Sequence, residues 1–215
     1  MTDDATRVVA VVPLRDGVSG KSRLAAALAP DERRRLVAEL ARHVVATLTA
    51  VERVERIVIV TADPPFVAEV LAGQSASARI SVLPQPGDRP GLNGALDLAR
   101  EQVRRDAPGT ALLVAHADLP ALGPDDVAAL LAAGRTADVV VATDRHGTGT
   151  NLLVLPADAA YDFRFGIGSR AAHEAEAARR GLTAVVVQRP GTAADLDTLD
   201  DWDELPAPTR ARLAG

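Results

Sequence analysis

Residues 7–12 read Arg-Val-Val-Ala-Val-Val, and this apolar run is followed by Pro13, Leu14 and a polar loop. Apolar residues at consecutive positions are typical of a strand buried on both faces, as in a parallel sheet covered by helices on both sides. A segment with helical period, over about residues 30–51, comes next. A strand followed by a helix is the repeating unit of doubly wound α/β proteins.

The same alternation continues along the chain. Further strands are predicted over residues 56–61, 79–83, 111–115, 138–143, 151–155 and 183–187. Further helices are predicted over residues 65–72, 93–105, 124–133 and 169–180, and the tail over 199–213 also has a helical pattern. We therefore expect a single α/β domain over residues 1–215, with a Rossmann-like, mostly parallel sheet and helices on both faces. Ligands of such sheets bind beyond the carboxyl ends of the strands.

The composition is that of a globular protein without cross-links. The chain has 215 residues, with 24 Lys and Arg against 29 Asp and Glu, a formal net charge of −5 and no Cys. A chain of this length buries roughly 70% of its unfolded surface, so its core needs neither disulfides nor a structural metal. The absence of Cys also excludes thiol nucleophiles and thiolate metal ligands, and it favours a reducing, cytoplasmic setting.

Nucleic acid and membrane are both disfavoured as partners. The acidic net charge and an aromatic content of 2% argue against a nucleic-acid surface, which needs clustered cations and stacking rings. Residues 1–7 are polar and acidic, so we expect no signal peptide. The apolar runs are far shorter than the roughly 18 residues of a membrane-spanning helix. A small anionic ligand stays compatible with these features.

The loop after the first strand carries three cations. It contains Gly20-Lys21-Ser22, but a phosphate-binding P-loop has its first Gly five residues before Gly20, where this chain has Arg15. Arg15, Lys21 and Arg23 supply positive charge, and glycines let backbone N–H groups approach an anion, which suits a triphosphate. The alternative is an ordinary solvated loop.

Acidic residues follow two later strands. Asp118 lies in the sequence His-Ala-Asp-Leu-Pro, directly after the strand over 111–115, and a carboxylate there is a natural Mg²⁺ ligand. Asp195 and Asp197 follow the strand over 183–187, and one of them could complete a metal site with Asp118. The alternatives are a turn-capping role for Asp118 and, for Asp200, Asp201 and Asp203, an interaction with the dipole of the last helix.

Two glycine-rich turns, over residues 147–151 and 165–169, form a third group. Ser169 is a suitable N-cap, and a helix N-terminus preceded by glycines favours phosphate or carboxylate. His173, one turn later, could support an anion, although a lone His on a helix is more often at the surface. No Ser/His/Asp set can be assembled from the sequence. Nucleotidyl transfer to a phosphate needs none, because the attacking oxygen is already anionic at neutral pH.

These motifs together resemble the 2-phospho-L-lactate and phosphoenolpyruvate guanylyltransferases of deazaflavin coenzyme F-420 biosynthesis, over nearly the whole chain. The resemblance is carried by residues 12–14, 20–24, 92–96, 116–120, 149–151, 165–169 with His173, and 195–198. It implies a fold of the nucleotide-diphospho-sugar transferase type and a Mg²⁺-dependent transfer of GMP from GTP. Bacterial members are the most similar, and for them the implied acceptor is phosphoenolpyruvate.

The resemblance also assigns roles to individual residues. Thr150, Gly166 and Ser169 would hold phosphoenolpyruvate. Mg²⁺ would be bound by Asp118 and Asp195, with Asp197 as a further candidate ligand. Lys21 and Arg23 would contact the triphosphate and, with Asp118, act in catalysis. The composition of the loop adds Arg15 and Gly20 as candidate nucleotide contacts. The segment over 84–90 together with Asn93 is a candidate pocket for the guanine base.

Several alternatives remain open at this stage. Ile167-Gly168 departs from the family pattern, and Asn151 resembles members that use 2-phospho-L-lactate, so 2-phospho-L-lactate and 3-phospho-D-glycerate remain alternative acceptors. A related nucleotidyltransferase acting on a sugar phosphate or on the molybdenum cofactor is a second enzymatic reading, and a nucleotide-binding scaffold is a non-enzymatic one. The sequence does not distinguish a monomer from a homodimer.

Overall fold

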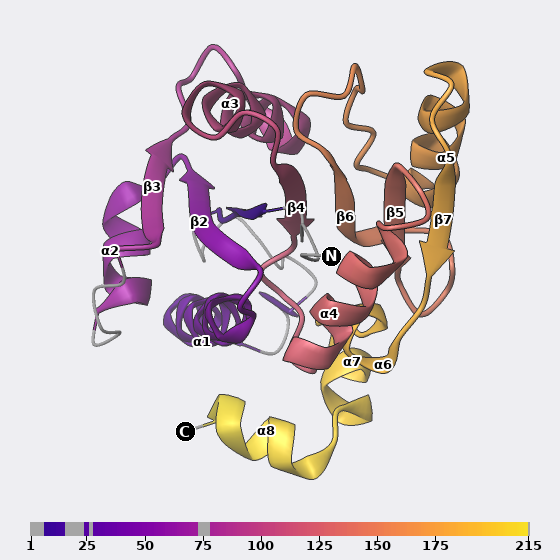
Figure 1. Cartoon of the computed structure of the whole chain (residues 1–215). Coiled ribbons are helices and arrows are strands. Elements are labelled where there is room, and N and C mark those ends of the chain that lie inside the picture. Colours follow the sequence, from indigo (N-terminus) through magenta and orange to yellow (C-terminus); the bar gives the residue numbers. More distant parts are fainter. Residues whose placement is uncertain (1–6, 16–23, 26–27, 73–77, 215) are drawn as a thin grey trace.

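The computed structural model describes residues 7–15, 24–25, 28–72 and 78–214. The described strands form one seven-stranded sheet in the order β3-β2-β1-β4-β6-β5-β7 (Figure 1). The strands are β1 (Val8–Pro13), β2 (Val54–Thr61), β3 (Ile80–Pro84), β4 (Ala111–Ala115), β5 (Val139–Thr143), β6 (Thr150–Pro156) and β7 (Ala184–Val187). The helices are α1 (Pro30–Ala50), α2 (Pro64–Leu71), α3 (Gly91–Asp106), α4 (Pro124–Ala133), α5 (Ser169–Arg179), α6 (Pro190–Ala193), α7 (Leu199–Glu204) and α8 (Ala207–Ala214).

The predicted mostly parallel sheet is confirmed. Strand β1 pairs in parallel with β2 and β4, and the pairs β2–β3 and β5–β7 are also parallel. Strand β6 runs antiparallel to both β4 and β5. Only a short turn joins β5 to β6, and a parallel pair would need a long crossover connection, so β6 returns alongside β5 in the opposite direction.

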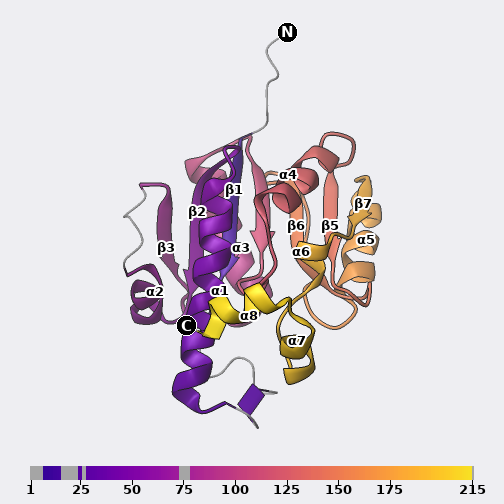
Figure 2. The same ribbon diagram turned by 90° about the horizontal axis from the view of Figure 1, so that it is seen from below.

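Helices cover both faces of the sheet, as the apolar strands predicted (Figure 2). Val8, Ala10 and Val12 of β1 belong to one apolar core, with side chains of α1, α2 and α4. Val9 and Val11 point the other way, into a second core with side chains of α3 and α5. All five residues are at most 2% exposed, which explains why β1 is apolar at consecutive positions.

The C-terminal part differs from the sequence prediction in two ways. The expected helical tail is two helices, α7 and α8, separated at Leu205 and Pro206. Proline lacks a backbone N–H and disfavours a helical conformation in the preceding residue, which accounts for the break. The short helix α6 was not predicted. In a third apolar cluster, Leu205 and Leu213 pack with Leu36, Leu40 and Leu196. This packing holds the C-terminal helices against α1.

Within the described ranges, no helix combines the length and the apolar character needed to cross a membrane.

Candidate functional site

A pocket of about 400 Å³ opens at the carboxyl ends of β1, β2 and β4. The loops after β1, β3 and β4, the start of α3 and the segment after α6 contribute to its wall. Its polar lining residues are Arg15, Gln85, His116, Asp118 and Asp197. A larger, mainly apolar pocket of about 710 Å³ lies between α1 and the C-terminal helices, and none of the predicted site residues that the structure describes lines it. The smaller pocket is therefore the candidate site, in the position expected for a doubly wound sheet.

The structure locates part of the predicted nucleotide-binding set. Arg15 follows β1 and lines the candidate pocket. Gly20, Lys21 and Arg23 lie outside the described residues, so their predicted roles stay predictions. Within the expected base pocket over 84–90, Gln85 lines the cavity and its amide nitrogen donates to the carbonyl oxygens of Arg89 and Gly91.

The three predicted metal ligands come from two segments that contact each other directly. The backbone N–H of Leu196, between Asp195 and Asp197, donates to the carbonyl oxygen of Asp118 at 3.1 Å. Burial raises the pKa of Asp195, and the negative charges of Asp118 and Asp197 raise it further. Asp118 and Asp195, nearly eighty residues apart in the sequence, thus lie at the same edge of the sheet, where their negative charges repel each other.

This donor set fits a Mg²⁺ ion. Carboxylate oxygens are its preferred protein ligands, and a bound cation would counteract both the burial and the charge repulsion that raise the pKa of Asp195. Among the described residues, no group of three or more His, Asp or Glu side chains is arranged to hold a metal alone. Mg²⁺ commonly takes one or two protein carboxylates and completes its coordination with water and substrate phosphates.

The acidic residues of the next helix have a structural role instead. The Asp201 carboxylate accepts hydrogen bonds from the backbone N–H groups of Asp197 and Thr198, each at 2.7 Å, and forms an ion pair with Arg145. Asp200 and Asp201 lie in the first turn of α7, where negative charge stabilises the helix dipole. This confirms the predicted interaction with the helix dipole for Asp200 and Asp201, but not for Asp203, which lies beyond the first turn of α7. The hydrogen bonds of Asp201 also hold the backbone that carries Asp197.

The start of β6 links the carboxylates to helix α5, which follows the loop over residues 165–169, the predicted acceptor loop. The amide nitrogen of Asn151 donates to Thr192 O at 3.0 Å and to Asp195 Oδ1 at 3.4 Å. Its neighbour Thr150 lies with its hydroxyl oxygen 3.0 Å from His173 Nδ1, on α5. Successive residues of a strand point to opposite faces, so this pair links two separate halves of the site.

His173 is not at the surface. It is fully buried, and besides the contact with Thr150 its Nε2 accepts a hydrogen bond from the backbone N–H of Arg164 at 3.0 Å. Its ring packs edge-on against Phe165, with centroids 4.6 Å apart. Burial lowers the pKa of His173 to about 4, and the charges of His116 and Arg164 add to this effect. This burial was not predicted, because it depends on contacts with two other segments, the start of β6 and the loop before α5.

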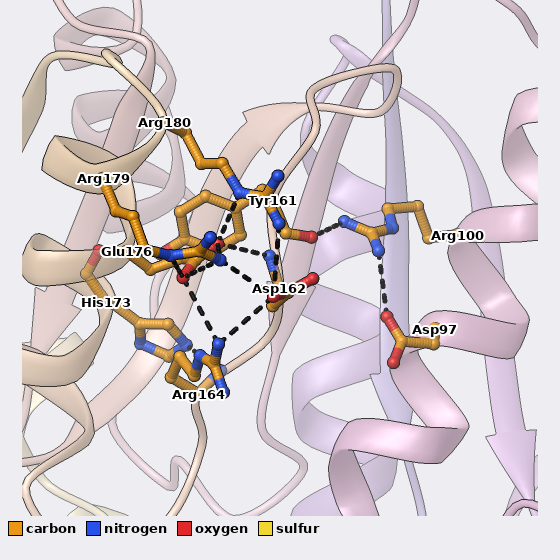
Figure 3. A network of polar contacts seen from close by, with 9 residues as sticks. All are labelled: Asp97, Arg100, Tyr161, Asp162, Arg164, His173, Glu176, Arg179 and Arg180. Carbon is orange, nitrogen blue, oxygen red and sulfur yellow. Dashed lines mark hydrogen bonds and ion pairs between the residues drawn. The ribbon is translucent and has the colours of Figure 1, made fainter.

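A network of charged residues holds the segment that leads into the acceptor loop (Figure 3). Glu176, which is 3% exposed, accepts from the backbone N–H of Asp162 at 3.1 Å and from the guanidinium groups of Arg179 and Arg180. Burial alone would raise the pKa of Glu176, but these hydrogen bonds outweigh burial and lower it to about 2. Sequence reasoning missed Glu176, although its spacing of three residues from His173 places both on one face of α5.

The acceptor loop itself contains two glycines with positive φ, Gly166 at 140° and Gly168 at 70°. Ser169 is the first residue of α5 and Gly168 is its N-cap, so the prediction that Ser169 is the N-cap is wrong. The backbone N–H of Ser169 donates to Gly166 O and that of Arg170 donates to Thr148 O. These two N–H groups therefore stabilise the loop. They are not free to bind an anion, although the sequence had suggested an anion site at this helix terminus.

The side chains predicted to bind the acceptor converge around this loop. Thr150 is 2% exposed and Ser169 is 3% exposed, so each would meet a ligand through a small open part of its surface. Gly166 is exposed. The predicted base-reading residue Asn93 makes two hydrogen bonds to the backbone of Phe165, at the start of the loop. The structure thus places Asn93 between the nucleotide pocket and the acceptor loop.

Solved structures with the same fold include nucleotidyltransferases. A Desulfovibrio desulfuricans protein assigned to the nucleotide-diphospho-sugar transferases superposes with a TM-score of 0.76 and 15% identity, covering 97% of this chain and 94% of that one. The 4-diphosphocytidyl-2C-methyl-D-erythritol synthase of Anaerococcus prevotii gives a TM-score of 0.64 and 12% identity, covering 99% and 98%. These similarities confirm the predicted fold of the nucleotide-diphospho-sugar transferase type.

Sequence comparison gives a narrower grouping. A protein of Sphaerobacter thermophilus named phosphoenolpyruvate guanylyltransferase is 42% identical over 197 residues, covering 92% of this chain and 91% of that protein. A protein of the same name from Rubrobacter xylanophilus is 39% identical over 201 residues, covering 93% and 94%. The profile of the family described as "Guanylyl transferase CofC like" matches residues 8–207. The chain therefore belongs to the family of CofC-like guanylyl transferases.

Proposed function

We propose that this protein is a cytoplasmic, Mg²⁺-dependent enzyme, one domain over residues 1–215, that transfers GMP from GTP to phosphoenolpyruvate. The products would be enolpyruvyl-2-diphospho-5'-guanosine and pyrophosphate, as an intermediate step of coenzyme F-420 biosynthesis. The observation that carries the proposal is the link through the start of β6, where Asn151 contacts Asp195 and Thr150 contacts the helix of the acceptor loop. The names of the similar proteins from S. thermophilus and R. xylanophilus support this choice of reaction.

The arrangement suits a direct displacement. A phosphate oxygen of the acceptor would attack the α-phosphorus of GTP, the new P–O bond would form, and the bond to the bridging oxygen of the β-phosphate would break. Pyrophosphate would leave with the electron pair, so no protein base is required. Arg15 would help to neutralise the triphosphate from the β1 side of the pocket, and the loop over 165–169 would hold the acceptor on the other side.

Asp118 and Asp195 would hold Mg²⁺, with Asp197 beside them. When bound, the ion would stabilise the negative charge that develops on the phosphate oxygens. The protein's own contribution is to keep these carboxylates in place, through the Leu196 to Asp118 backbone bond and the Asn151 amide.

The loop over 165–169 bears on the choice of acceptor. Ile167, at the position where the sequence departs from the family pattern, has a fully exposed side chain, and it lies between Gly166 and Gly168. Because this side chain points to solvent, it does not reduce the space available to the acceptor. We therefore keep phosphoenolpyruvate as the acceptor, with 2-phospho-L-lactate and 3-phospho-D-glycerate as the comparators.

The donor specificity tests the proposal. Purified protein is incubated with Mg²⁺, phosphoenolpyruvate and one of GTP, ATP, CTP or UTP, and the nucleotide product is identified by mass spectrometry. We expect the enolpyruvyl diphosphate of guanosine to form far faster than its analogues. Preferred formation of a cytidine product would contradict the proposal, and so would hydrolysis of GTP without coupling to the acceptor.

A further inference from the structure

His173 lies where the acceptor loop, the start of β6 and helix α5 meet. Its ring contacts the Thr150 hydroxyl at the start of β6, the backbone N–H of Arg164, and the rings of Phe165 and Tyr161. It is 0% exposed, and no part of its ring reaches a ligand directly. Any effect of His173 on a bound acceptor must therefore pass through a neighbouring residue.

The contact with Arg164 decides which ring nitrogen carries the proton. A backbone N–H is only a donor, so Nε2, 3.0 Å away, must accept and carries no hydrogen. A neutral imidazole has one N–H, which must then be on Nδ1. Burial keeps the ring neutral near pH 7, because it lowers the pKa of His173 to about 4. Nδ1–H therefore donates to the hydroxyl oxygen of Thr150, at 3.0 Å.

This donation orients the Thr150 hydroxyl. A hydroxyl has one hydrogen and two lone pairs, and the bond from His173 occupies one lone pair, so the O–H hydrogen must point elsewhere. In the part of the chain that the structure describes, that hydrogen has no acceptor. A nearly buried O–H group without an acceptor is a costly arrangement unless a ligand supplies one. An anionic oxygen is a suitable partner.

We propose that His173 is a positioning residue for the acceptor: its Nδ1–H holds the Thr150 hydroxyl so that this group donates to an anionic oxygen of the bound acceptor. The same ring, by accepting at Nε2 from Arg164, holds the backbone that leads to Gly166. The inference rests on the proposed function, because it takes the anion beside Thr150 to be phosphoenolpyruvate.

Two substitutions separate the two ring nitrogens. Counted in bonds from Cβ, the side-chain amide of Asn occupies the place of Nδ1, and that of Gln occupies the place of Nε2. His173→Asn therefore keeps a donor for Thr150 and loses the acceptor for Arg164. His173→Gln keeps an acceptor for Arg164 and loses the donor for Thr150. Thr150→Val removes the hydroxyl and retains the shape of the side chain.

The experiment measures kcat and the KM for each substrate in the wild type, in the three single variants and in the double variant of His173→Gln with Thr150→Val. We expect His173→Gln to raise the KM for phosphoenolpyruvate about 10- to 100-fold, the loss of one hydrogen bond to a charged group, and to leave the KM for GTP within about twofold. His173→Asn should bring the acceptor KM back towards the wild-type value. With Thr150→Val already present, His173→Gln should add less than about twofold, because its partner is gone.

A purely structural role for His173 gives a different pattern. His173→Gln and His173→Asn would then raise the KM for both substrates alike, and the effect of His173→Gln would persist in the Thr150→Val background. Either result overturns the inference. Nitrogen NMR of the histidine side chains is a second, activity-independent check, because a proton on Nε2 at pH 7 overturns it as well. No turnover of phosphoenolpyruvate by the wild type would instead remove the proposed function, and this inference with it.

Discussion

The side chain of Asn93 and the backbone of Phe165 are joined by two hydrogen bonds. Phe165 N–H donates to Asn93 Oδ1 at 3.0 Å, and Asn93 Nδ2 donates to Phe165 O at 3.1 Å. The two residues are 72 positions apart in the sequence. The pair connects the start of α3, which lines the candidate pocket, to the loop over 165–169, so Asn93 holds that loop from the side of the pocket.

This pairing predicts that Asn93→Ala weakens the binding of the acceptor more than the binding of GTP. Loss of both hydrogen bonds leaves two backbone groups of Phe165 without partners and loosens the loop, so we expect the KM for phosphoenolpyruvate to rise about tenfold or more. Steady-state kinetics with each substrate varied in turn measure the effect, and Gln102→Ala, farther along α3, is the control. A rise in the KM for GTP alone would return Asn93 to the guanine-reading role suggested by the sequence.

Two glycines with the same backbone conformation allow the effect of backbone strain on stability to be separated from an effect on acceptor binding. Gly168, in the acceptor loop, has φ of 70°, Gly181, after α5, has φ of 69°, and a Cβ on either would meet no atom within 4 Å. Alanine at either position should therefore lower the free energy of unfolding by a similar amount, about 1–2 kcal/mol. Only Gly168→Ala should also raise the acceptor KM. Equal kinetic effects of the two variants would show that the loop conformation does not matter for acceptor binding.

Glu176→Gln should destabilise the protein in a pH-dependent way. The pKa of Glu176 is lowered from 4.5 to about 2, so the stabilisation by its charge is complete above pH 4.5 and is lost as the pH falls towards 2. We expect the variant to unfold at a lower urea concentration at pH 7, with a loss of about 1–3 kcal/mol, because hydrogen bonds to a charged group are lost. The difference from the wild type should shrink at pH 3.

Glu174→Gln is the matched control for this measurement. Glu174 lies on the same helix, has a side chain that is 41% exposed and pairs with Arg170 at 3.8 Å, a contact that contributes little in water. Its variant should unfold close to the wild type at pH 7. A difference between Glu176→Gln and the wild type that stays constant from pH 7 to pH 3 would contradict the account of the charged network.

The carboxylates at the sheet edge predict a specific response to Mg²⁺. Asp118→Asn and Asp195→Asn should each raise the Mg²⁺ concentration for half-maximal rate at least about tenfold, while circular dichroism stays unchanged, because each removes a metal ligand from a folded site. Asp200→Asn, an exposed change in the next helix, should leave the Mg²⁺ dependence unaltered. Normal Mg²⁺ dependence in a folded Asp118→Asn variant would remove Asp118 from the metal site.

Much of the fold could be predicted because local patterns decide it. The strand over 7–12 is apolar at every position after Arg7, since both of its faces are covered, and the helix over 30–51 repeats its apolar residues with helical period. The single short turn of α6 is too brief for a period to be visible. The break at Pro206 had a local signal, the proline itself, which the helical pattern of the tail obscured.

The site could be predicted only in part. Asp118 carries a local signal, because it directly follows β4, whose end faces the pocket. Asp195 has a weaker signal, since the short helix α6 separates it from β7 at the edge of the sheet. The burial of His173 and the hydrogen bonds of Asn93 to Phe165 depend on α3, α5, the start of β6 and the loop over 165–169 coming together in the fold, and no spacing in the sequence encodes those contacts. The backbone bond of Arg170 to Thr148 is also long-range, and that of Ser169 to Gly166 depends on the positive φ of the loop glycines, which is why the helix terminus looked like an open anion site.

The most direct test of the proposed activity is pyrophosphate release. Purified protein with Mg²⁺ and GTP is given phosphoenolpyruvate, 2-phospho-L-lactate or 3-phospho-D-glycerate in separate reactions, with a control that lacks an acceptor. The account predicts rapid release with phosphoenolpyruvate, slow or no release with the other two, and none in the control. Release that is fastest with another acceptor, or equal with and without phosphoenolpyruvate, would contradict it.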